Sequence, residues 1–138
     1  RFNVEVANEN HPLTHNLPSQ FEVEDELYLI EMLGPAEILL TTELPEDPSP
    51  PGFGFYYEED TAIQPDKKTR VLGYEKTVGS GKVAYVALGH CHSTTTNSQP
   101  FVDESVAAGG TTPKTFTGAW ETPEFAQLLS NAVNWGVA

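Results

Sequence analysis

Residues 79–92 combine a turn, an apolar strand and two histidines in one stretch, Gly-Ser-Gly-Lys-Val-Ala-Tyr-Val-Ala-Leu-Gly-His-Cys-His. The glycines of the Gly-Ser-Gly turn permit the positive φ angles of a tight hairpin, and residues 83–88 are apolar enough for a strand covered on both faces. Gly89 then lets the chain turn at the strand end, which is where ligands bind in open α/β sheets. The stretch therefore predicts a functional site at His90.

His92 lies two residues beyond His90, so both imidazoles point to the same side if the chain stays extended. This spacing suits metal ligation or shared proton handling, and a pair of loop histidines bonded to backbone carbonyls remains the alternative. Cys91 is the single cysteine, which excludes an intrachain disulfide. The cofactor is left open, and the candidate that these residues favour is a divalent ion such as Zn²⁺ on His90 and His92, with a carboxylate from Asp25 or Glu26.

The composition is that of one strongly acidic domain. The 138 residues contain 20 Asp and Glu against 7 Lys and Arg, which gives a formal net charge of −13. This charge argues against nucleic acid and anionic membranes as partners, and no apolar run is long enough to cross a bilayer. We expect a soluble protein with a small-molecule ligand, and we leave the localisation open with the cytoplasm favoured.

Alternating and apolar segments predict several strands. They cover residues 1–7, 24–32 and 37–42, and a hairpin of 69–78 with 82–88. Of the two long loops, 45–66 precedes the hairpin and 93–119 follows it. Aromatic residues 53–57 in the first loop suit either a carbohydrate-stacking surface or an anchor that holds the loop to its own domain.

A helix closes the chain. Thr122 is a good N-cap, Pro123 suits the first helical position, and Gly136 ends the helix. One apolar stripe is expected to face the core. It consists of Phe125, Leu128, Leu129, Ala132 and Val133.

Four motifs occur in a characteristic order. They are His11-Pro12-Leu13-Thr14 with Leu17-Pro18, Asp25-Glu26-Leu27-Tyr28, Gly79-x-Gly81-Lys82-Val83-x-Tyr85-x-x-Leu88-Gly89-His90, and Asn134-Trp135-Gly136. Together they resemble the trehalose-utilisation (ThuA-like) family over residues 2–136. The resemblance implies an α/β fold of the class I glutamine amidotransferase-like (flavodoxin-like) type, with a doubly wound sheet. Residues 1–138 would be the carboxyl-terminal part of a single such domain, lacking its first strand-helix units.

The resemblance also implies roles for five residues. His90 matches the catalytic histidine of the amidotransferases, and Asp25 and Glu26 would orient it or handle a second proton. His11 and Tyr28 would lie at the same rim and contact the substrate. The partner would be a small-molecule sugar, and the chain would form a homo-oligomer or pair with its missing amino-terminal part.

Three functions remain open. The first is a ThuA-like domain that acts on or binds a carbohydrate or sugar derivative, by hydrolysis or another modification if it is an enzyme. The second is a non-catalytic sugar-binding or assembly module that keeps the fold without the nucleophile. The third is an all-β binding module with a terminal helix. Convergence of His90 with Asp25 or Glu26 would favour the first, and exposure of residues 53–57 would favour the second.

Overall fold

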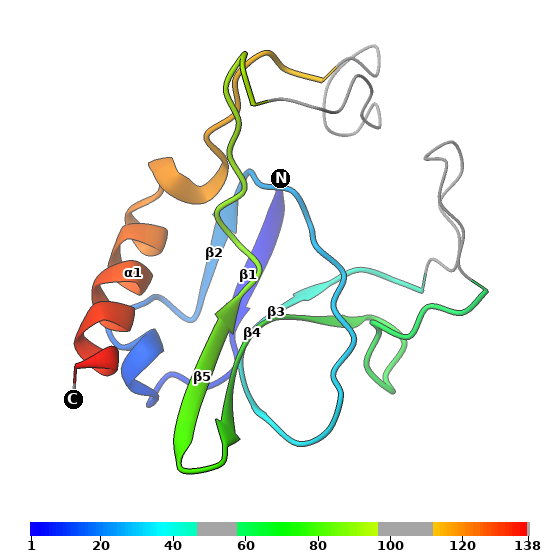
Figure 1. The fold of residues 1–138 in the computed structure, drawn as a ribbon. Coiled ribbons are helices and arrows are strands. Elements are labelled where there is room, and N and C mark those ends of the chain that lie inside the picture. Colours follow the sequence, from blue (N-terminus) through cyan, green and yellow to red (C-terminus); the bar gives the residue numbers. More distant parts are fainter. Residues whose placement is uncertain (47–57, 97–111, 138) are drawn as a thin grey trace.

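A computed structural model describes residues 1–46, 58–96 and 112–137 (Figure 1). In this part of the chain a curled sheet is flanked by one α-helix and two short 3₁₀ helices. The elements in chain order are β1 (Phe2–Val6), η1 (Pro12–Thr14), β2 (Gln20–Val23), β3 (Glu37–Glu43), β4 (Thr69–Val78), β5 (Gly81–Val86), η3 (Gly118–Glu121) and α1 (Pro123–Gly136).

The described strands form a five-stranded sheet in the order β2-β1-β3-β4-β5, and each neighbouring pair is antiparallel. The expectation of a mixed α/β protein is confirmed. The doubly wound, amidotransferase-like arrangement stays a prediction, because its parallel strand pairs are not among the described ones. An antiparallel sheet with a terminal helix is also what the third hypothesis expects.

Alternation of apolar and polar residues explains the edge of the sheet at β1 and β2. Val4 and Phe21 are register partners and both are buried, whereas the neighbouring partners Glu5 and Gln20 are exposed. One side of this strand pair therefore faces the core and the other faces solvent, as the period of two requires. The strand predicted over residues 1–7 is confirmed.

The centre of the sheet is buried on both sides. Leu39 and Leu40 are consecutive in β3 and are 2% and 0% exposed, and Val71 and Leu72 in β4 are 1% and 0% exposed. Gly73 lies opposite Leu40, and a Cβ there would sit 3.2 Å from the Leu40 side chain. The strand predicted over 37–42 is confirmed with one further residue.

The predicted hairpin of β4 and β5 is also confirmed. Gly79 in the connecting turn has a φ of +61°, a conformation that glycine adopts without strain. β5 ends at Val86, two residues earlier than predicted, but the Ala87 amide still donates to the Leu72 carbonyl at 2.7 Å. The chain therefore leaves the sheet close to His90.

Helix α1 begins as its sequence predicts. The Thr122 hydroxyl accepts a hydrogen bond from the Phe125 amide at 3.3 Å, and Pro123 follows the cap. Phe125 and Leu128 are buried in the core. The predicted stripe was too wide, because Leu129 and Val133 are 38% and 67% exposed. At 3.6 residues per turn they lie to one side of the buried positions and face solvent.

The strand predicted over residues 24–32 was wrong. β2 lies earlier, at Gln20–Val23, and residues 24–36 cross the molecule without forming a regular element. The side chain of Asp25 accepts hydrogen bonds from backbone amides that lie far along the chain, which holds an irregular backbone in place here. Aromatic residues 53–57 lie outside the described residues.

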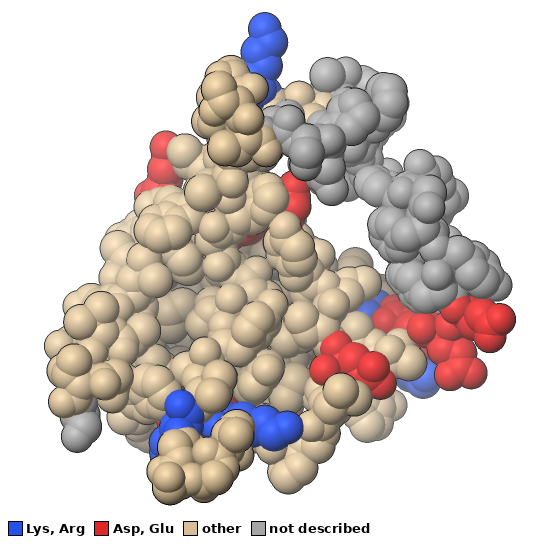
Figure 2. All heavy atoms as spheres, in the orientation of Figure 1, with Lys and Arg blue, Asp and Glu red and all other residues tan. Residues whose placement is uncertain are grey.

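On the face that Figure 2 shows, acidic side chains are concentrated in one region. In Figure 2 they lie mostly at the right, near the ends of β3 and β4, while the surface over α1 is almost free of charge. The 14 residues of α1 include one charged side chain, Glu124. Buried Arg70 bonds both carboxylate oxygens of Asp60 and the carbonyls of Leu44 and Pro45, which fixes the segment that leads into β4.

Candidate functional site

His90 lies where the chain leaves β5, next to the start of α1. Gly89 has a φ of +101°, and a Cβ at this position would sit 2.7 Å from a ring carbon of Phe125. The Trp120 indole donates a hydrogen bond to the Gly89 carbonyl at 2.8 Å and its ring contacts Phe125 edge-on. The glycine thus lets the backbone turn against the aromatic side chains at the helix start, which fixes the position of His90.

The carboxylate of Asp25 holds three chain segments together. One oxygen accepts from the amides of Glu26 at 2.8 Å and His90 at 3.2 Å. The other accepts from the amides of Gly89 at 2.7 Å and Ala119 at 3.2 Å. Because both oxygens accept two backbone hydrogen bonds, the arrangement gives Asp25 a positioning role rather than contact with a substrate.

Glu26, Tyr28 and His90 form a closed network of three side chains. The Tyr28 hydroxyl lies 2.7 Å from His90 Nδ1 and donates to Glu26 Oε2 at 3.1 Å. His90 Nε2 lies 3.4 Å from Glu26 Oε1, so each member contacts the other two. A carboxylate, a phenol and an imidazole in mutual contact can exchange protons with one another.

Tyr28 keeps its proton at neutral pH. Burial raises the pKa of the Tyr28 phenol above its ordinary value, and the negative charge and hydrogen bond of Glu26 raise it further. The residue is nevertheless 44% exposed. Tyr28 is therefore a protonated donor that solvent, or a ligand, can reach.

His92 belongs to a neighbouring aromatic contact. Its backbone pairs with Phe116 at 2.9 Å and 3.0 Å, and the Phe116 ring lies against the rings of both His90 and His92. His92 Nε2 donates to the Pro113 carbonyl at 2.7 Å, which leaves Nδ1 as its only lone pair. The His90 and His92 rings are 5.8 Å apart, and both nitrogens of His90 already face Tyr28 and Glu26. The predicted metal pair therefore has one ring nitrogen to offer, from His92, unless a metal displaces the His90 contacts.

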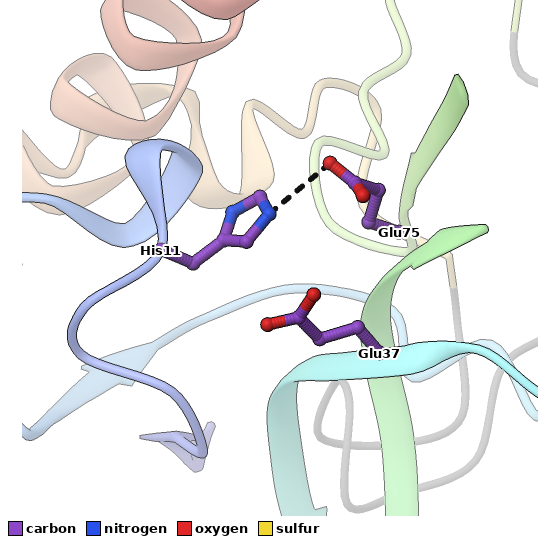
Figure 3. Close-up of side chains that lie close together, drawn as sticks. All are labelled: His11, Glu37 and Glu75. Carbon is purple, nitrogen blue, oxygen red and sulfur yellow. Dashed lines mark hydrogen bonds and ion pairs between the residues drawn. The ribbon is translucent and has the colours of Figure 1, made fainter. Parts of the chain in front are cut away.

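His11 lies in a second cluster, at the other end of α1. Figure 3 shows its imidazole beside two carboxylates from adjacent strands, Glu37 and Glu75, which are register partners. The Trp135 indole, near the end of α1, also donates to Glu75 at 3.0 Å, whereas Trp120 near His90 precedes the helix. A helix of 14 residues is about 20 Å long, so the structure does not bring His11 together with the network at His90.

The second cluster has potential metal ligands within 4.8 Å of one another, in His11, Glu37 and Glu75. However, the Leu13 amide donates to His11 Nδ1 at 3.2 Å, so the proton of a neutral imidazole is on Nε2 and points to Glu75 at 3.1 Å. A protonated nitrogen cannot ligate a metal. Lys82 and Trp135 also donate to Glu75, at 2.7 Å and 3.0 Å. These donors fit a buried structural carboxylate that ties β4 and β5 to η1 and α1, not a metal centre.

Several contributors to these two clusters were not expected from the sequence. They are Glu75, Phe116, Gly118 and Trp120. Glu75 carries the one usable signal, an acid in a strand whose earlier residues include the apolar pair Val71-Leu72. Gly118 has a φ of +56°, and a Cβ there would lie 2.3 Å from the His90 carbonyl oxygen. Only the folded structure reveals this close approach.

Comparisons with known proteins returned no relatives. No family model, no curated protein and no solved structure matches this chain. Among the described residues, no helix has the length and apolar character needed to cross a bilayer.

Proposed function

We propose that this chain is a ThuA-like domain with a class I glutamine amidotransferase-like fold, and that its site at Glu26, Tyr28 and His90 acts on or binds a carbohydrate or sugar derivative. The supporting observation is the convergence of these side chains at the end of β5. Sugar hydroxyls both donate and accept hydrogen bonds. A carboxylate, a phenol and an imidazole together offer the matching acceptors and donors.

Aromatic side chains beside the network add to the argument. The Phe116 ring centre lies 6.0 Å from that of His90, and Trp120 is 53% exposed while its indole nitrogen is held by Gly89. Ligand sites commonly combine aromatic surfaces with a few polar groups that fix orientation. An apolar ring surface can pack against the C–H groups of a pyranose, while the neighbouring polar groups bond its hydroxyls.

The alternative is a sugar-binding module without catalysis. It is favoured by the Asp25 carboxylate, because both of its oxygens accept backbone hydrogen bonds, which gives Asp25 a positioning role instead of contact with a substrate. Glycoside hydrolysis usually needs two carboxyl groups across the scissile bond, and the network contains one, that of Glu26. Binding of a sugar without turnover would support this alternative.

The test is a titration of the protein with glucose and with trehalose, in which ligand-observed NMR measures binding. Removing a charged hydrogen-bond partner costs about 1.5–3 kcal/mol, so Glu26→Gln should weaken sugar binding about tenfold or more. Glu31→Gln is the matched control, because Glu31 is an exposed acid in the same segment. Saturable binding that only Glu26→Gln weakens supports the proposal. No saturable binding by the unmodified protein, or equal loss in both variants, would overturn it.

A further inference from the structure

The network of Glu26, Tyr28 and His90 contains three contacts between polar atoms. With a neutral histidine, only two protons are available to fill them. Three pairs of atoms meet: Tyr28 Oη with His90 Nδ1 at 2.7 Å, Tyr28 Oη with Glu26 Oε2 at 3.1 Å, and His90 Nε2 with Glu26 Oε1 at 3.4 Å. Each contact is attractive only if one proton lies between the two atoms. The phenol supplies one proton, a carboxylate supplies none, and an imidazole supplies one or two.

Counting protons separates two states of the network. With an imidazolium, Nδ1–H donates to Tyr28, Nε2–H donates to one oxygen of Glu26, and the Tyr28 hydroxyl donates to the other, so all three contacts are filled. With a neutral imidazole, the Tyr28 hydroxyl donates to Nδ1 and Nε2–H still donates to Glu26. The two states differ by one proton, and Glu26 stays ionised in both.

Exposure shows which member a ligand meets. Tyr28 is 44% exposed, whereas the side chains of His90 and Glu26 are 25% and 23% exposed. Asp25 holds the backbone of His90 through its amide, and the imidazole contacts the Tyr28 hydroxyl through Nδ1. Tyr28 is therefore the member of this network that is most accessible to a ligand.

We propose that Tyr28 is the catalytic acid of this site, which donates its phenolic proton to a sugar oxygen that gains negative charge, while His90 and Glu26 resupply that proton. This inference rests on the proposed function. The Tyr28 hydroxyl turns from Glu26 Oε2 to the ligand oxygen. Its O–H bond breaks as an O–H bond forms on that oxygen, whose electron pair comes from the C–O bond that breaks in the sugar. A water molecule then adds to the sugar carbon and releases a proton to solvent. The resulting phenolate takes the proton from His90 Nδ1. The imidazolium becomes neutral, with Nε2–H still on Glu26, so one proton has moved to the ligand.

The surroundings are consistent with a protonated acid. The pKa of Tyr28 is raised by burial and by the charges of Glu26 and Asp25, so the phenol holds its proton until a ligand oxygen takes it. Tyr85 from β5 and His92 beyond the strand are the other titratable groups near this network. The charges that raise the pKa of the phenol are carboxylates, which favour its neutral form.

The first experiment observes the His90 side-chain nitrogens by ¹⁵N NMR at a pH high enough for the imidazole to be neutral. We expect the Nε2–H tautomer in the unmodified protein. Tyr28→Phe removes the donor to Nδ1, so the Nδ1 signal should shift toward that of an unbonded nitrogen while Nε2 keeps its proton. Tyr74→Phe is the control, because it removes a phenol that stacks on Tyr85 instead. An Nδ1–H tautomer in the unmodified protein, or identical spectra for both variants, would overturn the relay.

The second experiment measures turnover of trehalose. General acid catalysis contributes about 10²- to 10⁴-fold, so Tyr28→Phe should lower kcat by that factor with little change in KM. Turnover that survives Tyr28→Phe, or sugar binding without turnover, would refute the acid role while leaving a sugar site intact. If no sugar binds at all, the proposed function fails instead, and the tautomer spectra still decide whether the relay exists.

Discussion

The buried carboxylate of Glu75 offers the sharpest test of the fold. It is 5% exposed, and it accepts hydrogen bonds from His11 at 3.1 Å, Trp135 at 3.0 Å and Lys82 at 2.7 Å. These donors come from the turn before η1, from α1 and from β5. Removing the carboxylate therefore weakens the contacts among three elements at once.

The cost of Glu75→Ala follows from the donors that it leaves behind. The buried imidazole N–H of His11 and the half-buried indole N–H of Trp135 lose their acceptor. A buried unpaired donor costs about 1–3 kcal/mol and a half-buried one costs less, so we expect a loss of about 2–4 kcal/mol. Lys82 is 55% exposed and regains water, so its lost ion pair adds at most about 1 kcal/mol. Glu75→Gln keeps one acceptor oxygen for the buried donors and should cost about 1–2 kcal/mol.

Urea denaturation followed by tryptophan fluorescence measures these free energies. The matched control is Glu37→Ala, because Glu37 is the exposed register partner of Glu75 on β3 and should cost less than about 1 kcal/mol. Glu75→Gln keeps the test informative if Glu75→Ala does not fold. Glu75→Gln and Glu37→Ala could lower the free energy of unfolding equally, with Glu75→Ala no worse than either. That result would refute the conclusion that the Glu75 carboxylate joins three elements through its three donors.

Three further predictions concern other parts of the molecule. The Lys82 ammonium and the His11 contact hold the pKa of Glu75 below its ordinary 4.5. The stability that this carboxylate contributes is therefore present above pH 4.5 and is lost as the pH falls through the folded-state pKa. The free energy of unfolding of Glu75→Gln should accordingly depend less steeply on pH in acid than that of the unmodified protein. Gly118→Ala should destabilise by about 1–3 kcal/mol through its positive φ and a clash, while Gly136→Ala, which meets open space, should be near neutral in the same melts. Asp60→Ala should cost about 3–5 kcal/mol by calorimetry, because it leaves Arg70 charged and buried; a loss below 1 kcal/mol, on the order of an exposed pair, would contradict this.

Local patterns were enough to predict much of this fold. The Gly-Ser-Gly turn predicted the hairpin of β4 and β5, and Thr122 with Pro123 predicted the start of α1. In each case the signal lies within a few residues of the element that it predicts. The width of the helix stripe was overestimated, because apolar residues at Leu129 and Val133 do not reveal that neighbouring elements leave them uncovered.

The irregular segment and the position of His11 could not be obtained in this way. Residues 24–36 hold their path through the bonds of Asp25 to amides that lie far along the chain, and no local pattern encodes such partners. His11 meets Glu75 because η1 and β4 are adjacent in space, at the far end of α1 from His90. The contacts of Glu26 and Tyr28 with His90 were expected from a family resemblance, and the distances among them came from the structure.

The position of Asp25 has a consequence for the order in which this protein folds. Its carboxylate joins residues 64 positions away at Gly89 and 94 positions away at Ala119, so it can be satisfied only after most of the chain has closed into large loops. The amide protons of these two residues should then exchange with deuterium together, in one opening event, and at a rate unrelated to that of their sequence neighbours. Any molecule that binds beside this carboxylate would slow that exchange by the same linkage through which it stabilises the folded chain.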